Sequence, residues 1–284
     1  MAVHHKYNDE LQKELRGVIA DNRMGIWLWF FMKNNHPQEP VGEIKSPGMR
    51  DRIANIIKKN PKLADQIEAL STTQLIPESI LEWITDNKRQ NAFITKKLDQ
   101  AAGFSYTHNP GKLTNRELSI AAIDCFPIDH MGKLLLVQHI KSEWELNSST
   151  DHIFKWLDKG ETVQKVQTAW EIINNKHQHL LNQHYQSREK DDLLIAFDSS
   201  TLTPSEKALL MDSIKKRWSQ NKYRAKLIGK NQYNFILSDR AICRLDKLAK
   251  KHEIKRTEVL EILLKMEEEN GDHILKHLNR LSDL

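Results

Sequence analysis

Residues 231–266 have the sequence NQYNFILSDRAICRLDKLAKKHEIKRTEVLEILLKM, which joins an alternating segment to two patterns typical of helices. In the alternating segment two sets of side chains take every second position, Gln232, Asn234 and Ile236 in one set and Tyr233, Phe235 and Leu237 in the other. Successive side chains of a β-strand point to opposite faces. We therefore predict one strand over residues 232–237, with one apolar face and one face that is mostly amide.

A helix with a basic face is predicted to follow the strand. Ser238 is a favoured N-cap residue, and Asp239 places a negative charge in the first turn, where the helix dipole favours it. Apolar residues then recur at helical spacing, at Ile242, Leu245, Leu248 and Ala249. The opposite face carries the cations Arg240, Arg244, Lys247, Lys250 and Lys251. A second helix is expected after the turn at residues 252–255, and its apolar residues cover more than one stripe.

The predicted strand has no partner in its own sequence neighbourhood. An isolated strand leaves its backbone hydrogen-bonding groups unpaired and is unstable in water. The simplest partner is the same strand of a second copy, paired antiparallel about a two-fold axis. We therefore predict a homodimer whose core contains side chains of the strand and the second helix, namely Tyr233, Phe235, Leu237, Leu260, Leu263 and Leu264.

This order of elements resembles the ribbon-helix-helix family of DNA-binding proteins. The resemblance lies in residues 232–237, the cap at Ser238 and the tetrapeptide Lys255-Arg256-Thr257-Glu258 at the entry to the second helix. It implies that a two-stranded ribbon lies in the major groove of DNA. It also implies phosphate contacts near the start of the second helix, from Lys255, Arg256 and Thr257.

The same resemblance assigns the base contacts to Gln232, Asn234 and Ile236. The amides of Gln and Asn can form paired hydrogen bonds with adenine, and Ile can touch a thymine methyl group. A preference for A·T-containing half-sites is therefore expected. For Ile236, a structural role is an equal alternative to a base contact.

A basic run precedes the strand. Residues 199–201 are expected to form a hinge, and Thr203-Pro204-Ser205-Glu206 has the N-cap, N1 proline and capping-box Glu of a helix start. Phosphate contacts are predicted from the cations of this run and of the residues just after it, namely Lys215, Lys216, Arg217, Lys222, Arg224, Lys226 and Lys230. The alternative, which is not exclusive, is a basic helix that packs on its own domain through Trp218.

The arrangement over residues 203–268 is similar to the macrodomain Ter protein (MatP) family of bacterial nucleoid-organising factors. The similarity consists of a helix that opens near a proline, a basic run with aromatic residues, a short polar spacer and the ribbon-helix-helix pattern. It implies that the helical region and the ribbon-helix-helix both contact DNA. Bridging between dimers would need a longer C-terminal helix than residues 269–284 provide.

The distribution of charge supports a DNA-binding C-terminal region. The net charge of the chain is +5. Residues 211–260 contain 14 Lys and Arg against 5 Asp and Glu, so this segment carries +9 and the rest of the chain −4. A basic face of this kind is expected of a protein that binds the phosphate backbone, although a solvated helix face is an equal alternative.

Residues 1–198 are predicted to form helices without a catalytic site. The dense aromatic residues Trp27, Trp29, Phe30 and Phe31 indicate a core, and the pair Thr114 and Glu117 indicates a capped helix start. Residues 134–140 fit a helix, with a buried strand as the alternative. No phosphate-binding loop, nucleophile elbow or metal-ligand spacing is present, so no cofactor and no metal are expected.

The cysteines and the apolar runs indicate a soluble protein of a reducing compartment. Cys125 and Cys243 are far apart and have no metal or redox spacing. The longest apolar run, residues 26–32, is much too short to span a bilayer. We therefore expect a cytoplasmic, nucleoid-associated protein.

These observations predict a mainly α protein with four parts. We expect a helical domain over 1–198 for partner binding or oligomerisation, a basic helix and linker over 199–230, a ribbon-helix-helix over 231–268, and a short C-terminal helix over 269–284. The predicted function is sequence-specific binding of double-stranded DNA by a homodimer, as a bacterial transcriptional regulator or as a nucleoid or plasmid organising factor. The alternatives are an enzyme targeted to DNA by the ribbon, and an antitoxin whose N-terminal part holds a toxin.

Overall fold

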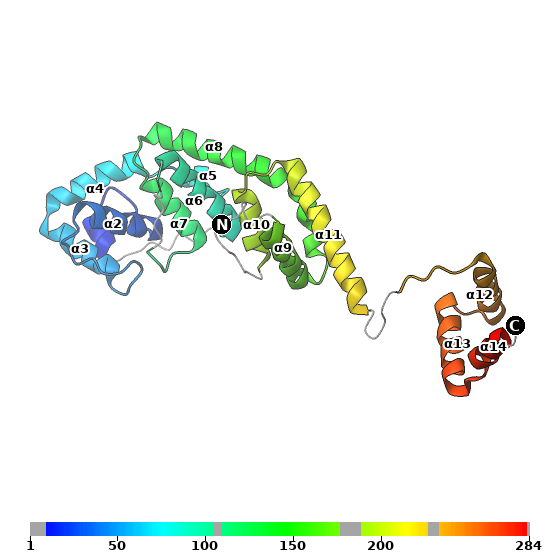
Figure 1. Cartoon of the computed structure of the whole chain (residues 1–284). Helices are drawn as coiled ribbons and strands as arrows, with labels where there is room; N and C mark the ends of the chain where they lie inside the picture. Colours follow the sequence, from blue (N-terminus) through cyan, green and yellow to red (C-terminus); the bar gives the residue numbers. More distant parts are fainter. Residues whose placement is uncertain (1–9, 105–109, 177–188, 227–232, 283–284) are drawn as a thin grey trace. The chain divides into compact units, whose positions relative to one another are not determined.

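The computed structural model describes residues 10–104, 110–176, 189–226 and 233–282, and the regular secondary structure in these ranges is helical. The chain forms two compact units, residues 1–223 and residues 224–284 (Figure 1). None of the helices in the described ranges is both long and apolar enough to cross a lipid bilayer. Because the regular secondary structure of the described ranges is helical, the predicted mainly α class is confirmed.

The predicted strand at residues 232–237 is wrong. Residues 233–237 pair with no other segment, no strand occurs in the described ranges, and Gln232 lies outside them. The side chains of Tyr233, Phe235 and Ile236 are 70%, 73% and 104% exposed. Alternation determines which side chains share a face, but a strand also needs a hydrogen-bonded neighbour, and the described chain provides none. The described structure is therefore not a ribbon-helix-helix.

The first group of helices surrounds a core built on Trp27. It contains α1 (Glu10–Glu14), α2 (Asn22–Asn35), α3 (Met49–Lys59) and α4 (Pro61–Gln74). The carboxylate of Asp21 caps α2 by accepting a hydrogen bond of 2.8 Å from the backbone N–H of Met24. Trp27 is 1% exposed, and Phe31 stacks against it with ring centroids 5.5 Å apart. The predicted aromatic core is confirmed for these two side chains, whereas Trp29 and Phe30 lie at its edge.

A second core lies between the helices of the middle group. These helices are α5 (Glu78–Leu81), α6 (Lys88–Ala102), α7 (Asn115–Asp124) and α8 (His130–Ser149). The capping box predicted for α7 is confirmed, because the Thr114 hydroxyl accepts from the Glu117 N–H at 3.3 Å and the Glu117 carboxylate accepts from the Thr114 N–H at 2.9 Å. Residues 134–140 lie in α8, so the helix is confirmed over the strand alternative, and Val137 and Ile140 are buried.

The third core of the N-terminal unit includes part of the predicted linker. It is formed by η1 (Asp151–Asp158), α9 (Thr162–Lys176), α10 (Lys190–Ser199) and α11 (Pro204–Lys226), and Figure 1 shows the three groups following one another in chain order. Leu210, Met211 and Ile214 of α11 are buried against this core. The first compact unit therefore continues to residue 223, beyond the boundary at residue 198 expected from the sequence.

The C-terminal unit contains three helices in its described part, α12 (Asp239–His252), α13 (Arg256–Asn270) and α14 (Asp272–Ser282). Ser238 caps α12 as predicted, because its hydroxyl accepts a hydrogen bond of 3.3 Å from the backbone N–H of Ala241. Gly271 has a φ of 64° and ends α13 in the left-handed conformation that glycine adopts without strain. Among the described side chains of this unit, only Val259 is buried, at 5% exposure.

Candidate nucleic-acid interface

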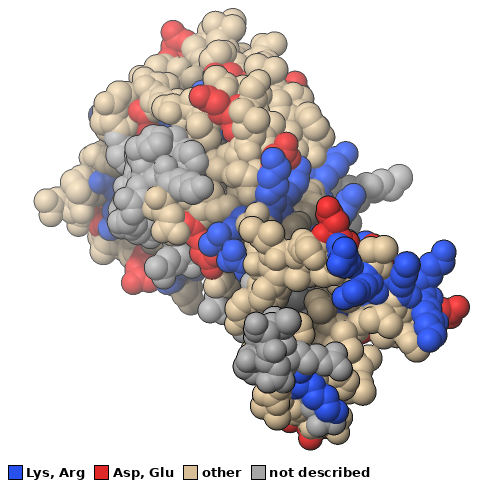
Figure 2. Space-filling view, turned by 45° about the vertical axis from the view of Figure 1, so that its right-hand side comes forward, with Lys and Arg blue, Asp and Glu red and all other residues tan. Residues whose placement is uncertain are grey.

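A stripe of positive charge runs along α12. Arg240, Arg244, Lys247 and Lys251 follow one another at spacings of four, three and four residues, which places them on one face of a helix. The helical rise separates the first from the last by about 16 Å along the axis. All four side chains are exposed, and Figure 2 shows Lys and Arg gathered on one side of this unit. We call these four residues the α12 stripe.

The carboxylates of α12 do not neutralise the α12 stripe in the described structure. Asp246 of α12 pairs with Arg256 of α13, and Asp239 lies in the first turn of α12. In the described part of the chain, no ion pair involves a cation of the stripe. Residues 224–256 contain 10 Lys and Arg against 3 Asp and Glu, whereas residues 257–284 contain 3 against 7. The basic half of the unit is therefore the half that includes α12.

The predicted base contacts lie just before α12. Asn234 and Ile236 are exposed, and the flanking rings of Tyr233 and Phe235 stack with centroids 6.2 Å apart. The third predicted contact, Gln232, lies outside the described residues. An exposed amide close in sequence to a cationic helix is suited to hydrogen bonding with a base edge, and the structure leaves Asn234 free to do so.

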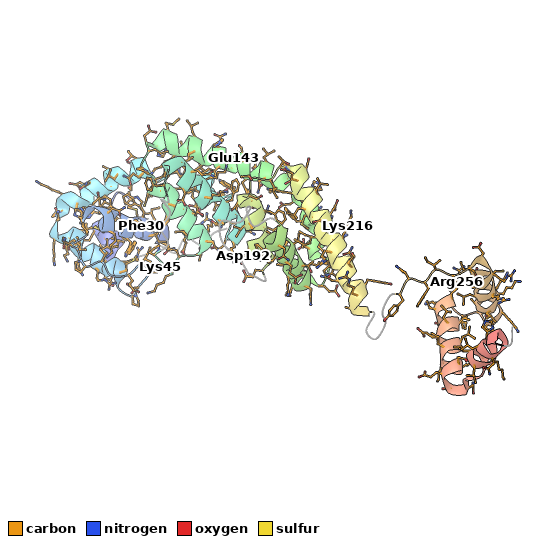
Figure 3. The ribbon with its side chains drawn as sticks, viewed as in Figure 1. Phe30, Lys45, Glu143, Asp192, Lys216 and Arg256 are labelled. Carbon is orange, nitrogen blue, oxygen red and sulfur yellow. The ribbon has the colours of Figure 1, made fainter. Side chains whose placement is uncertain are left out.

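The predicted phosphate contacts at the start of α13 differ in their surroundings. The backbone N–H of Lys255 donates to the Glu258 carboxylate at 3.0 Å, so the chain itself satisfies one donor of this helix end. Arg256, labelled in Figure 3, donates a hydrogen bond to the carboxylate of Asp246 and forms an ion pair with it. Lys255 and Thr257 are exposed. This turn therefore adds one cation, Lys255, that is not held by a carboxylate in the described structure.

The predicted phosphate contacts of α11 are divided between internal and exposed roles. Lys222 binds Glu161 at 2.8 Å and lies 4.7 Å from the centroid of the Trp218 ring. Trp218 packs edge-on against Trp156 with centroids 5.6 Å apart, which confirms the alternative that this helix packs on its own domain. Lys215 pairs with Asp212 at 2.9 Å.

The remaining cations of this run are Lys216, Arg217 and Arg224, which are exposed, and Lys226 and Lys230, whose side chains lie outside the described part of the structure. Figure 3 shows Lys216 on α11, well before its end. The α11 cations up to residue 223 belong to the N-terminal unit and the α12 stripe belongs to the C-terminal unit. The basic run and the stripe are therefore two separate candidate surfaces.

The C-terminal unit exposes an unusual amount of apolar surface. Of the predicted dimer-core residues, Leu237, Leu263 and Leu264 are 42%, 47% and 71% exposed, and Leu260 is half-buried. Further exposed apolar side chains of α13 and α14 are Ile262, Met266, Ile274, Leu275 and Leu278. Large exposed apolar side chains, when they gather into a patch, mark sites of association. The structure therefore leaves the predicted dimer-core residues available to a partner.

Sequence patterns located the cations of α12 but did not assign them to DNA. They belong to the basic face expected of a phosphate binder, with a solvated helix face as an equal alternative, whereas the individual contacts are predicted at residues 232–236, on α11 and at the start of α13. The signal was nevertheless present, because the spacing of four, three and four residues defines one helix face. What the sequence did not show is that these cations have no carboxylate partner among the residues that the structure describes.

A metal centre finds no support in the described residues. No group of three or more His, Cys, Asp or Glu in these ranges is placed to hold a metal ion. Comparison with protein-family models, with curated proteins and with solved structures finds no match to this chain. Function is therefore inferred from the chemistry of the residues themselves.

The two cysteines provide a test of the exposed surface of α12. Burial raises the pKa of the Cys125 thiol to about 12, whereas Cys243 is exposed on α12. Because the thiolate is the reactive form, we expect a maleimide at pH 7 to modify Cys243 and leave Cys125 intact in the folded chain. Mass spectrometry of tryptic peptides measures both sites, and denaturant should make both reactive. Equal modification of both cysteines before denaturation would contradict the raised pKa of the Cys125 thiol.

Proposed function

We propose that this chain binds double-stranded DNA through its C-terminal unit and does so as a homodimer. The observation that carries the proposal is the α12 stripe, four exposed cations on one helix face without carboxylate partners in the described structure. Cations that are not neutralised internally can replace the counterions of DNA phosphates. Phosphates of one strand recur every 3.4 Å or so along the duplex axis, about a fifth of the stripe's length, so several lie within its reach.

A second copy of the chain is the occupant that we assign to the apolar surface. One buried side chain in the described part of a unit of this size does not make a stable core, because small domains bury a small fraction of their surface. In a two-fold dimer the same surface meets itself, so one set of exposed leucines supplies both sides of the interface. Dimerisation also joins two α12 stripes in one assembly, which strengthens binding to a long polyanion.

The proposed biological role is that of a bacterial transcriptional regulator or a factor that organises a nucleoid or plasmid. Both roles require a preference for certain sequences, for which the exposed amide of Asn234 is the candidate reader. The helical N-terminal unit then has the role of binding a protein partner. Genome-wide mapping of bound sites distinguishes a regulator with few operators from an organiser with many dispersed sites.

Fluorescence anisotropy of the full-length chain with a labelled duplex tests DNA binding directly. We expect the logarithm of the association constant to fall linearly with the logarithm of salt concentration, by about 0.9 for each phosphate that is neutralised. Affinity that is independent of salt, or no binding at about 0.05 M salt, would show that the α12 stripe does not contact phosphates.

Leu264→Asp is expected to dissociate the homodimer. The substitution places a charge in the proposed interface, and burying an unpaired charge costs several kcal/mol, so the dimer dissociation constant should rise about a hundredfold or more. Sedimentation equilibrium measures the change. The control is Leu135→Asp on α8, because Leu135 is 63% exposed and Leu264 is 71% exposed. A chain that is monomeric before substitution, or equal effects of both variants, would disprove the proposed interface.

Asn234→Ala is expected to weaken binding to a preferred DNA site and to leave binding to random DNA nearly unchanged. A bidentate contact between an amide and adenine contributes about 1–3 kcal/mol of discrimination, which corresponds to roughly fivefold to 150-fold in affinity. The preferred site is first selected from a randomised library, and both duplexes are then titrated. Equal losses on the two duplexes would mean that Asn234 does not read bases.

A further inference from the structure

A pocket of about 430 Å³ lies in the N-terminal unit, between residues of α6, α8, α10 and the start of α11. This volume lies within the range of about 300–1,000 Å³ that is usual for small-molecule sites. The pocket is remote in sequence from the α12 stripe, and every helix that lines it belongs to the N-terminal unit. It is therefore separate from the DNA-binding proposal.

Four cationic side chains line the pocket, but carboxylates pair with only two of them in the described structure. Arg89 binds Asp198 at 2.6 Å, and Lys97 binds Glu143, labelled in Figure 3, at 2.9 Å. Lys96 and Lys207 form no ion pair with a described carboxylate. The Lys96 ammonium donates to a neutral group, the Ser199 carbonyl oxygen, at 3.3 Å.

The two lysines without carboxylate partners are partly removed from water. Both are half-buried, and burial lowers the pKa of each amino group. The positive charges of Lys97 and Lys207 lower the pKa of Lys96 further, whereas the Asp198 carboxylate raises the pKa of both Lys96 and Lys207 in part and the charge of Arg89 lowers that of Lys207. An anion bound in the pocket would stabilise the charged form of both lysines.

Part of the remaining pocket lining is apolar. Phe93, Leu146, Ile195 and Pro204 line it, and Leu146 is 73% exposed. An aromatic or aliphatic group placed there would cover apolar surface that water now contacts. The pocket therefore combines a cationic part with an apolar part, which is the combination that recognises an organic anion.

We propose that this pocket binds a small organic phosphate, with the phosphate group at Lys96 and Lys207 and the organic group against Phe93 and Leu146. A phosphate dianion matches two ammonium groups in charge, and lysine binds phosphate as a point charge. The carboxylates already present are occupied by Arg89 and Lys97, so they do not compete for these two lysines through an ion pair in the described structure.

Titration calorimetry of the full-length chain with phenyl phosphate tests the proposal, with inorganic phosphate and phenol as separate probes. We expect saturable millimolar or tighter binding of phenyl phosphate, weaker binding of inorganic phosphate, and no binding of phenol. Lys96→Ala combined with Lys207→Ala should weaken phenyl phosphate binding at least tenfold. Because neither lysine forms an ion pair in the described structure, the double substitution should leave the fold intact, and the thermal unfolding midpoint of the variant verifies this.

The control variant is Lys58→Ala combined with Lys59→Ala, which removes two exposed lysines of α3 and should leave phenyl phosphate binding unchanged. Equal weakening in both variants, or no saturable binding of phenyl phosphate, would overturn the proposal. Inorganic phosphate that binds as tightly as phenyl phosphate would overturn the role of the apolar wall. A loss of DNA affinity in the Lys96 and Lys207 variant, without a loss of phenyl phosphate binding, would assign these lysines to DNA instead.

Discussion

Alanine at Arg244, Lys247 and Lys251 together is expected to weaken DNA binding about 500-fold at about 0.1 M salt. Each cation that neutralises a phosphate contributes about 0.9 to the slope of log K against log salt concentration. This contribution vanishes near 1 M salt, so three lost contacts lower log K by about 2.7 at about 0.1 M. Anisotropy titrations at several salt concentrations measure both the affinity and the slope. The magnitude of the slope should decrease by about 2.7 as well.

The matched control for this variant removes the same net charge from the N-terminal unit. Lys58, Lys59 and Lys62 are exposed residues of α3 and α4, and alanine at these positions should change the slope very little. Alanine also favours helix, so α12 should persist in the test variant, as circular dichroism can verify. Equal weakening by both variants would mean that net charge, rather than the α12 stripe, accounts for binding.

Arg89→Ala is expected to lower the free energy of unfolding of the N-terminal unit by about 3–5 kcal/mol. The guanidinium group binds Asp198 at 2.6 and 3.0 Å and Asp151 at 2.7 and 2.9 Å. The side chains of Arg89 and Asp198 are each 6% exposed. Without Arg89, the buried Asp198 carboxylate loses this cation and keeps a hydrogen bond of 3.0 Å from the Asn147 amide. An uncompensated buried charge is strongly destabilising.

Urea unfolding followed by tryptophan fluorescence measures this change. All 7 tryptophans lie in residues 1–223, so the signal reports the N-terminal unit alone. The control is Lys88→Ala at the adjacent position, where Lys88 is 44% exposed and binds Glu189 and Asp192 at 2.8 Å (Asp192 is labelled in Figure 3). Exposed ion pairs contribute about 0–1 kcal/mol. Similar small losses of unfolding free energy in both variants would show that the contacts of Arg89 with Asp151 and Asp198 do not stabilise the N-terminal unit.

Local signals in the sequence predicted where helices begin. Ser238 and Thr114 cap their helices through short-range hydrogen bonds, and Pro204 begins α11 as expected of an N1 proline. These features depend on residues within one turn of each other, so the sequence specifies them directly. The same holds for the spacing of the α12 stripe, which any helix over residues 239–252 must present on one face.

Long-range contacts could not be obtained in the same way. Arg89 meets Asp151 and Asp198, which are 62 and 109 residues away in the sequence, and no local pattern marks them as partners. The extension of the N-terminal unit to residue 223 has the same origin, because Leu210 and Ile214 of α11 complete a core shared with α9 and α10. Both features depend on which helices become neighbours.

By itself the sequence determined the helical class, the helix starts and the basic face of α12, since these follow from intrinsic backbone preferences and from a fixed helical repeat. Only the tertiary structure decided that residues 233–237 pair with no strand in the described ranges, which cations have no carboxylate partner there, and which lysines line a pocket. Those outcomes depend on hydrogen-bonding and charge partners that folding brings together from distant positions, and periodicity along one segment does not contain that information.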